Sequence, residues 1–210
     1  MLKGRIVLLA NGFADSGETK STLGLTEWML SQGILTVAHI GWATKGFPEQ
    51  HRRANDIAIE RMKGVGFLVI DIQPTKSGVE SLKKFDAIYL NGGHPATLRW
   101  MLKETGADKA IQKFHQEGKP ILGASSGGIV LGSGSLFLVS QVAVKPITGV
   151  PWMVRQGLIG SGLGLYPEAL IPHRAENDSQ ARLPKCLARL GLFGAKKLIF
   201  VADGQIKVID

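Results

Sequence analysis

Two adjacent serines in a turn of small residues, Ser125 and Ser126, are the first candidates for a nucleophile. Residues 123–127 read Gly-Ala-Ser-Ser-Gly and fit the pattern G-x-S-x-G, in which a strand turns sharply into a helix and exposes the central hydroxyl. The start of such a helix offers a backbone N–H group and a favourable dipole to a developing oxyanion. Ser125 is favoured because it directly follows the expected strand, although small residues also flank Ser126. The alternative is a phosphate-binding turn, although the Gly-Lys-Ser/Thr ending of a P-loop is absent.

A serine nucleophile needs a general base, and the chain contains five histidines. His173 comes at the end of an apolar run and polar residues follow it, which is typical of a catalytic histidine on a loop at a strand tip. His94 follows two glycines at the tip of another expected strand, so we expect it near the same pocket, as a base or as a substrate contact. The other three are expected to serve elsewhere: His39 in a structural role, and His51 and His115 at the surface.

The general base in turn needs a carboxylate that orients its ring. Asp203 is one candidate, because it lies at an expected strand end and follows His173 in the chain. Glu176 and Asp178 are close to His173 in the sequence, and Glu168 is a further candidate. The sequence alone separates these carboxylates poorly.

Apolar runs alternate with amphipathic stretches over the first 130 residues, and these elements must position the turn at 123–127. Strands are predicted over 5–10, 34–40, 67–72 and 86–93, with a fifth running into the turn, and helices over 21–33, 48–66, 77–85, 95–106 and 107–118. This alternation favours an α/β three-layer sandwich with a mostly parallel, flavodoxin-like central sheet. The apolar run 67–72 predicts a strand buried on both sides. Ligands of such folds bind at the carboxyl ends of the strands, so the glycine-rich tips of the fourth and fifth strands are the predicted site.

Beyond residue 133 the pattern changes to short strands and loops, followed by a predicted helix over 178–192. The last residues predict two strands joined at Ala202–Gly204 as a C-terminal β-hairpin. No internal repeat, low-complexity tract or linker is visible, so we expect one domain over residues 1–210.

The net charge of +8 is spread along the chain rather than gathered into a stripe with interleaved aromatic residues. It therefore predicts a basic surface, compatible with acidic small substrates, and no nucleic-acid partner. The single cysteine, Cys186, allows neither an internal disulfide nor a Cys-rich metal site, which fits a reducing compartment. No signal peptide and no run of about 18 apolar residues is visible, so we expect a cytoplasmic protein without a membrane partner.

Four blocks of the sequence resemble the peptidase E (aspartyl dipeptidase) and cyanophycinase family of serine peptidases. Residues 86–98 resemble the family's strand that ends in a Gly-Gly-Gly-Asn loop, and residues 105–128 resemble its helix, strand and G-x-S-A-G turn. Residues 162–178 resemble its Gly-Leu-Gly segment and Pro-His strand end, and residues 199–210 resemble its C-terminal hairpin with an acidic residue. The resemblance covers most of residues 85–210, whereas the first 80 residues agree only in their pattern of strands and helices.

The resemblance implies a class I glutamine-amidotransferase-like fold and hydrolysis of short peptides through an acyl-enzyme, often next to an N-terminal aspartate. By position, it makes Ser125 the nucleophile, His173 the general base and Asp203 the acidic partner. The backbone N–H groups of Gly93 and Ser126 form the implied oxyanion hole, and neither a metal nor a cofactor is implied. The implied partner is a small peptide substrate, and a homodimer is left open.

The chain departs from the family pattern at two places. Ser126 stands where G-x-S-A-G has alanine, which should preserve the backbone N–H, and Asn91-Gly92-Gly93-His94 stands where the family has Gly-Gly-Gly-Asn. His94 therefore predicts a changed specificity, and Arg174 is a candidate contact for a substrate carboxylate. The competing hypotheses are a non-catalytic relative that binds a small ligand or partner in this pocket, and an amidase or esterase. A glutamine amidotransferase is disfavoured, because the turn carries serine instead of cysteine and Cys186 lies far along the chain.

Overall fold

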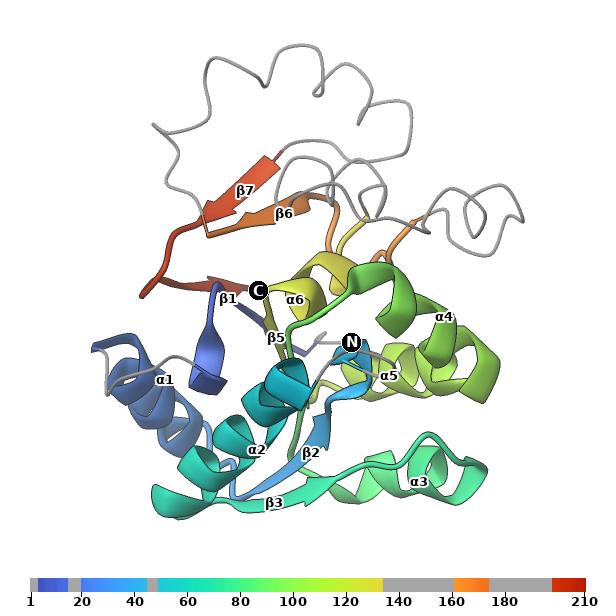
Figure 1. The fold of residues 1–210 in the computed structure, drawn as a ribbon, viewed down its shortest axis with the longest axis horizontal. Coiled ribbons are helices and arrows are strands. Elements are labelled where there is room, and N and C mark those ends of the chain that lie inside the picture. The colour runs from blue at the N-terminus through green and yellow to red at the C-terminus, as the bar shows by residue number, and fades with distance from the viewer. Residues whose placement is uncertain (1–3, 15–19, 45–48, 134–160, 174–197) are drawn as a thin grey trace.

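The computed structural model describes residues 4–14, 20–44, 49–133, 161–173 and 198–210 (Figure 1). The strands are β1 (Ile6–Leu9), β2 (Thr36–Ile40), β3 (Leu68–Asp71), β4 (Ala87–Leu90), β5 (Ile121–Ala124), β6 (Ala169–Pro172), β7 (Leu198–Val201) and β8 (Ile206–Ile209). The α-helices are α1 (Lys20–Ser31), α2 (Glu49–Gly64), α3 (Lys76–Ser81), α4 (Pro95–Thr105), α5 (Ala107–Gln116) and α6 (Ser126–Leu131), with 3-10 turns η1 (Gly12–Ala14), η2 (Trp42–Thr44) and η3 (Leu82–Lys84). The predicted helix over 178–192 lies outside the described residues. None of the helices in the described part of the chain is long and apolar enough to cross a membrane.

Six strands form the central sheet, in the order β3-β2-β4-β5-β1-β8. All neighbouring strands are parallel except β1 and β8, which run antiparallel. The carboxyl ends of β4 and β5 lie side by side, with Leu90 opposite Gly123. The loop after β4 and the turn after β5 therefore meet at the edge of the sheet where open α/β folds bind their ligands.

Helices cover both faces of the central sheet, because the strands are apolar on both faces. Val7 and Leu9 of β1 belong to the core that includes α1 and α2. Ile6 and Leu8 point to the opposite face and belong to the core that includes α4, α5 and α6. The structure confirms the predicted α/β three-layer sandwich with a mostly parallel central sheet (Figure 1).

A second, small sheet consists of the parallel strands β6 and β7 and packs on α6 (Figure 1). The predicted C-terminal hairpin is wrong, because β7 pairs with β6 whereas β8 pairs with β1. A tight turn does join the two strands, with the Gln205 N–H donating to the Ala202 carbonyl at 3.0 Å. A turn fixes only the change of direction, and here the chain crosses to the open side of β1 instead of pairing with its preceding strand.

The prediction that the strand at 67–72 is buried on both sides is also wrong. β3 is an edge strand of the central sheet. Its Leu68 and Ile70 side chains are 59% and 46% exposed, whereas Val69 between them is buried. An apolar run indicates a strand, but the position of that strand in the sheet depends on which neighbours it finds.

Candidate active site

Ser125 lies on the sharp turn between β5 and α6. Its backbone has φ 47° and ψ −111°, a strained conformation for a residue with a side chain, which costs about 1–3 kcal/mol. Two backbone hydrogen bonds hold it there. The Ser125 N–H donates to the Leu9 carbonyl at 2.9 Å, and the Ile129 N–H donates to the Ser125 carbonyl at 3.0 Å. The turn leaves Ser125 partly exposed at the tip of β5.

The glycines on either side of Ser125 are required by close packing. A Cβ atom at Gly123 would lie 2.6 Å from the Gly128 nitrogen, and one at Gly127 would overlap the Leu90 carbonyl oxygen. Helix α6 therefore approaches both β5 and β4 more closely than any larger residue allows. This is the physical reason for the small residues that the G-x-S-x-G pattern has at these positions.

His173 and Asp203 form a hydrogen-bonded chain with Ser125. The His173 Nε2 lies 3.0 Å from the Ser125 Oγ, and the His173 Nδ1 lies 2.7 Å from the Asp203 Oδ1. A neutral imidazole in this position donates from Nδ1 to the carboxylate and accepts the serine proton at Nε2. The His173 side chain is 35% exposed, so a substrate and water can reach it. Both distances are within the reach required of a nucleophile, a base and an orienting carboxylate.

The small sheet positions both His173 and Asp203. His173 directly follows β6 and Asp203 comes two residues after β7, so both extend from the carboxyl ends of adjacent parallel strands. The His173 N–H donates to the Val201 carbonyl at 2.9 Å, and the Ala202 N–H donates to the Gln205 side chain at 3.0 Å. The ends of β5, β6 and β7 therefore converge on one point.

The segment that precedes β6 holds the small sheet to α6, the helix that follows Ser125. The Tyr166 hydroxyl donates to the Gly128 carbonyl of α6 at 2.8 Å, and the Leu163 N–H donates to the Val130 carbonyl at 2.7 Å. Burial, together with the nearby Glu168 carboxylate, raises the pKa of Tyr166, so its hydroxyl stays protonated as a donor. These bonds fix the distance between the two strand systems that carry Ser125 and His173.

The loop after β4 lies beside the nucleophile and leaves one backbone N–H available. Three N–H groups of this loop donate to oxygens of the protein, those of Asn91, Gly92 and His94. No acceptor in the described part of the chain takes the Gly93 N–H, and Gly93 has φ 137°, which favours glycine. A Cβ atom at Gly92 would lie 3.3 Å from the Ser125 Cβ, so the loop contacts the nucleophile directly. Ser126 begins α6, where the first N–H groups have no acceptor within the helix.

Ser126 does not contact the base. It is 1% exposed, and its hydroxyl donates to the Gly93 carbonyl in the loop after β4. His173 contacts Ser125 instead. The geometry therefore separates the roles of the two adjacent serines. Only Ser125 contacts His173, whereas the Ser126 side chain joins the start of α6 to the loop after β4.

His94 is the N-cap residue of α4. Its Nδ1 accepts a hydrogen bond from the Thr97 N–H at 3.0 Å and lies 3.1 Å from the Thr97 Oγ1. The residue is 7% exposed, and burial lowers the pKa of His94 below its ordinary value. The cap holds the ring in its neutral form, because a protonated Nδ1 cannot accept the Thr97 N–H. A contact between His94 and a substrate stays a prediction.

The other two described histidines are both buried. His39 has the structural position expected of it, fully buried with its Nδ1 2.8 Å from the Asp71 Oδ1. His115 was expected at the surface, and this prediction is wrong, because the residue is only 5% exposed. The buried residues of α5 follow a helical stripe that includes His115: Ala107, Ile111, Phe114 and His115.

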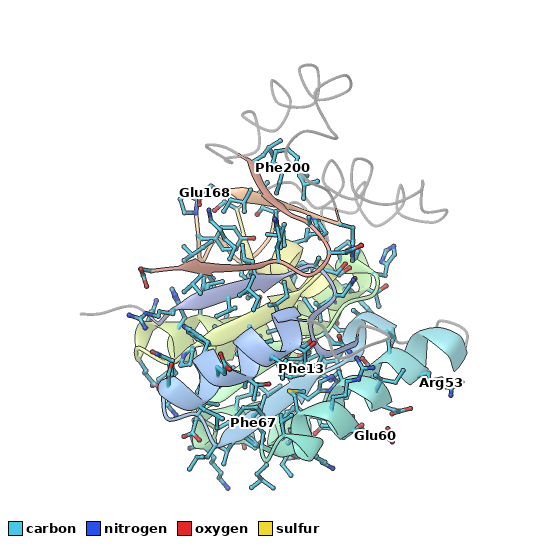
Figure 2. All side chains as sticks on the ribbon, turned by 90° about the vertical axis from the view of Figure 1, so that its left-hand side faces the viewer. Phe13, Arg53, Glu60, Phe67, Glu168 and Phe200 are labelled. Carbon is cyan, nitrogen blue, oxygen red and sulfur yellow. The ribbon has the colours of Figure 1, made fainter. Side chains whose placement is uncertain are left out.

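The remaining predicted residues have no described contact with the serine. The carboxylate on His173 is Asp203, whereas Glu168 lies beside the start of the small sheet (Figure 2). Several predicted residues lie outside the described part of the chain: Arg174, Glu176, Asp178, Cys186 and the side chain of His51. Among the described residues, no three potential metal ligands gather into a candidate metal site.

Sequence reasoning missed a pair of asparagines beneath the loop after β4. The Asn91 Nδ2 donates to the Asn55 Oδ1 at 2.8 Å, although 36 residues separate the two in the chain. Asn91 carries a visible signal, since it is a polar residue at the first position of a glycine-rich strand tip. Asn55 in the middle of α2 carries none, because its partner is set by how the helix packs on the sheet.

Comparisons with known proteins show a family and a shared fold. The profile of peptidase family S51 matches residues 7–210. The chain is 30% identical over 87 residues (41% of this chain, 42% of that protein) to pyridoxal 5'-phosphate synthase subunit PdxT of Pyrococcus horikoshii. It is 28% identical over 88 residues (40% of this chain, 42% of that protein) to the uncharacterized peptidase Lin0382 of Listeria innocua. The aligned part is therefore less than half the length of either relative.

Solved structures also resemble the chain over nearly its whole length. A protein described as a peptidase E from Listeria monocytogenes EGD-e superposes with a TM-score of 0.66 over 99% of this chain and 97% of that one, at 19% sequence identity. At this level of identity the likeness establishes a common fold.

Proposed function

The chain belongs to peptidase family S51, and we propose that it is a serine peptidase that hydrolyses short peptides through an acyl-enzyme on Ser125. The observation that carries the proposal is the hydrogen-bonded chain from Ser125 through His173 to Asp203, with distances of 3.0 Å and 2.7 Å. A hydroxyl is a weak nucleophile until an adjacent base accepts its proton, and this geometry supplies that base.

The proposed reaction uses each of these groups once in each half. The Ser125 Oγ attacks the substrate carbonyl carbon while its proton moves to the His173 Nε2. Asp203 stabilises the imidazolium that forms, and the N–H groups of Gly93 and Ser126 bind the carbonyl oxygen as it becomes negative. His173 then gives the proton to the leaving amine, and the acyl group remains on Ser125. In the second half His173 takes a proton from water as the water oxygen attacks the acyl carbon. It then returns this proton to the Ser125 Oγ as the bond between Ser125 and the acyl group breaks and the acid product leaves.

The proposed substrate class is argued from the net charge and from two candidate contact residues. A small peptide with an acidic N-terminal residue suits the net charge of +8, and His94 and Arg174 are the proposed contacts. His94 lies in the loop between Gly93 and α4, adjacent to the proposed oxyanion donor. The proposal includes no metal, cofactor, nucleic-acid or membrane partner, and it leaves a homodimer open.

The test of the nucleophile is labelling with a fluorophosphonate, which phosphonylates an activated serine with loss of fluoride. We expect the wild-type protein to be labelled and Ser125→Ala to lose both labelling and hydrolysis of dipeptides, with a rate lower by about 10⁴- to 10⁶-fold. Ser126→Ala is the matched control, because it removes the neighbouring hydroxyl and should still be labelled. Labelling that survives in Ser125→Ala and disappears in Ser126→Ala would reverse the assignment.

The competing hypotheses are separated by the substrate rather than by the nucleophile. Parallel assays with dipeptides, simple amides and esters should give hydrolysis of the dipeptides with the highest kcat/KM. Cleavage restricted to amides or esters would identify an amidase or esterase. A wild-type protein that is neither labelled nor active would support a non-catalytic binding protein, even though the His173 Nε2 lies within hydrogen-bond distance of Ser125.

A further inference from the structure

We propose that Asn91 and Ser126 are positioning residues that hold the loop 91–94 so that the Gly93 N–H points at the carbonyl oxygen of the substrate, with Asn55 as their anchor on α2. The inference rests on the proposed function, since it concerns the oxyanion hole of that reaction. It adds three side chains to those that act on the reacting atoms, and none of the three touches the substrate in this arrangement.

Asn91 fixes the start of the loop through both ends of its side-chain amide. The Asn91 Oδ1 accepts the Gly92 N–H at 2.8 Å. The Gly92 N–H therefore does not compete with the Gly93 N–H for the carbonyl oxygen of the substrate. The Asn91 Nδ2 donates to the Asn55 Oδ1 at 2.8 Å and reaches the Ala54 carbonyl at 3.4 Å. Asn91 is only 1% exposed, so water cannot replace these bonds, and loss of any of them leaves a buried polar group unpaired.

Asn55 connects the side-chain amide of Asn91 to the turn after β2. Its own Nδ2 donates to the Thr44 Oγ1 at 2.8 Å and to the Gly41 carbonyl at 3.1 Å. Both acceptors lie at or beside η2, after β2, and the neighbouring Ala43 carbonyl accepts the His94 N–H at 2.9 Å. The network therefore holds the loop after β4 against the turn after β2 at both of the loop's ends.

Ser126 fixes the other side of the same loop. Its buried hydroxyl donates to the Gly93 carbonyl, so the peptide group between Gly93 and His94 has a hydrogen bond on its oxygen and another on its nitrogen. A Cβ atom at Gly93 would lie 2.7 Å from the Ala43 carbonyl oxygen, which leaves the backbone no room to shift toward η2. The bond also joins the loop to the residue directly after the nucleophile, so the two oxyanion donors move as one unit.

These contacts matter for catalysis because an oxyanion hole acts only on the charge that develops in the transition state. A donor that is displaced by a fraction of an ångström still lets the substrate bind, but it stabilises the oxyanion less. Loosening the loop should therefore lower kcat and leave KM nearly unchanged. A residue with only a structural role would instead lower the folded fraction and the unfolding temperature, and would leave kcat per folded molecule the same.

The experiment compares Asn91→Ala, Asn55→Ala and Ser126→Ala for kcat, KM, unfolding temperature and affinity for a peptide aldehyde. Ser125 adds to the aldehyde carbon, its proton passes to His173, and the former carbonyl oxygen becomes an oxyanion that needs the Gly93 N–H. We expect kcat to fall by about 10- to 100-fold in Asn91→Ala and by about 5- to 50-fold in the other two, with KM within about twofold. The affinity for the aldehyde should fall by the same factor as kcat in each variant. Asn55→Ala combined with Asn91→Ala should be little worse than Asn91→Ala alone, because the two residues share one network.

The matched control is Thr26→Val, which removes another buried hydroxyl that donates to a backbone carbonyl, the Thr22 carbonyl in α1, at 2.9 Å. It should keep the wild-type kcat and aldehyde affinity. The inference is overturned if the wild type is active and the folded variants keep its kcat and aldehyde affinity, or if KM rises while kcat is unchanged. A wild type without labelling or hydrolysis would overturn the proposed function, and this inference with it. Ser126→Ala and Asn55→Ala keep the test decisive if Asn91→Ala fails to fold.

Discussion

The described part of the molecule contains two histidine–aspartate pairs with nearly the same geometry. The His39 Nδ1 is 2.8 Å from the Asp71 Oδ1, and the His173 Nδ1 is 2.7 Å from the Asp203 Oδ1. Each pair joins two neighbouring parallel strands, β2 with β3 and β6 with β7, near their carboxyl ends. The pairs differ in what lies on the other ring nitrogen and in how far the ring is exposed.

The His39 ring is sealed in the core, stacked on Tyr89 with ring centroids 5.9 Å apart, and its Nε2 has no hydrogen-bond partner among the described residues. The His173 ring is 35% exposed, and its Nε2 contacts the Ser125 Oγ. A histidine and a carboxylate therefore do not make a catalytic pair by themselves. Proton transfer needs a third group to give the proton and an opening through which a substrate can arrive.

The largest expected contrast between the pairs comes from removing each ring. His173→Ala should lower kcat/KM by about 10⁴- to 10⁶-fold and change the free energy of unfolding by less than about 1 kcal/mol. His39→Ala should do the opposite, lowering the free energy of unfolding by about 2–4 kcal/mol through the cavity it leaves, with kcat within about threefold. Steady-state kinetics and urea unfolding on the same preparations measure both. An active His173→Ala would remove this histidine from the mechanism.

The carboxylates should repeat the contrast with a smaller effect. Asp203→Asn should lower kcat by about 10²- to 10³-fold, less than the 10⁴-fold loss known for a buried orienting aspartate, because Asp203 is 61% exposed and water can take over part of its role. Asp71→Asn should leave kcat unchanged, since the amide oxygen can still accept from His39. Glu168→Gln is the control among the alternative carboxylates and should match the wild type. A loss of activity in Glu168→Gln that exceeds the loss in Asp203→Asn would reassign the acidic partner.

The His39 Nε2, which has no hydrogen-bond partner among the described residues, allows a sharper test of the buried pair. His39→Leu fills the space of the ring, removes this nitrogen and leaves the half-exposed Asp71 to be solvated. We expect it to be more stable than His39→Ala by at least about 1 kcal/mol, because a volume-conserving apolar swap in a core costs less than a cavity. Chemical unfolding of the two variants measures the difference. Equal stabilities would mean that the bond to Asp71, rather than the packing of the ring, sets the contribution of His39.

The smallest expected effect concerns His94, which caps a helix with a neutral ring. Burial lowers the pKa of His94 below its ordinary value of 6.5, so the unfolded chain binds more protons than the folded chain between the two pKa values. Its contribution to stability is complete above pH 6.5 and is lost as the pH falls through that value toward the lower pKa of the folded state. His94→Asn keeps a capping side chain that does not titrate.

The measurement is the unfolding free energy of His94→Asn and of the wild type between pH 5 and pH 8. The variant should lack part of the wild-type loss on acidification, and at pH 8 the two should agree within about 0.5 kcal/mol. Parallel curves for the two proteins over the whole range would show that His94 does not titrate differently on folding.

Sequence patterns predicted most of the central layer and the place of the site. Apolar runs and helix boundaries depend on local residues, so β1 to β5 and α1 to α5 lie close to their predicted ranges. Strand tips rich in glycine also have a local cause, and the predicted Ser125, His173 and Asp203 lie together in the structure. The predictions that are wrong concern contacts between segments that are distant in the sequence. The exposure of β3 follows from its place at the edge of the central sheet. The hairpin prediction is wrong because β8 pairs with β1 and not with β7.

The fine structure of the site was less predictable than its location. The two serines have the same side chain and adjacent positions, and only the turn geometry sends one hydroxyl to His173 and the other to the Gly93 carbonyl. The contact between Asn55 and Asn91 depends on how α2 packs on the sheet, which no local pattern encodes. His115 is different, because the helical spacing of Ala107, Ile111 and Phe114 already indicates that it lies on the buried face of α5, whatever the polarity of its side chain.

The residues of the proposed triad belong to two separate sheets, and this affects when in folding activity can arise. Ser125 and His173 are 48 residues apart in the chain, and their contact requires the small sheet to dock on α6. Contacts between distant segments form late, because the chain between them must first be ordered. A chain in which only the parallel strands β1 to β5 have assembled therefore still carries an inert serine. Peptide hydrolysis would begin only with this last docking step, which makes activity a direct readout of complete folding.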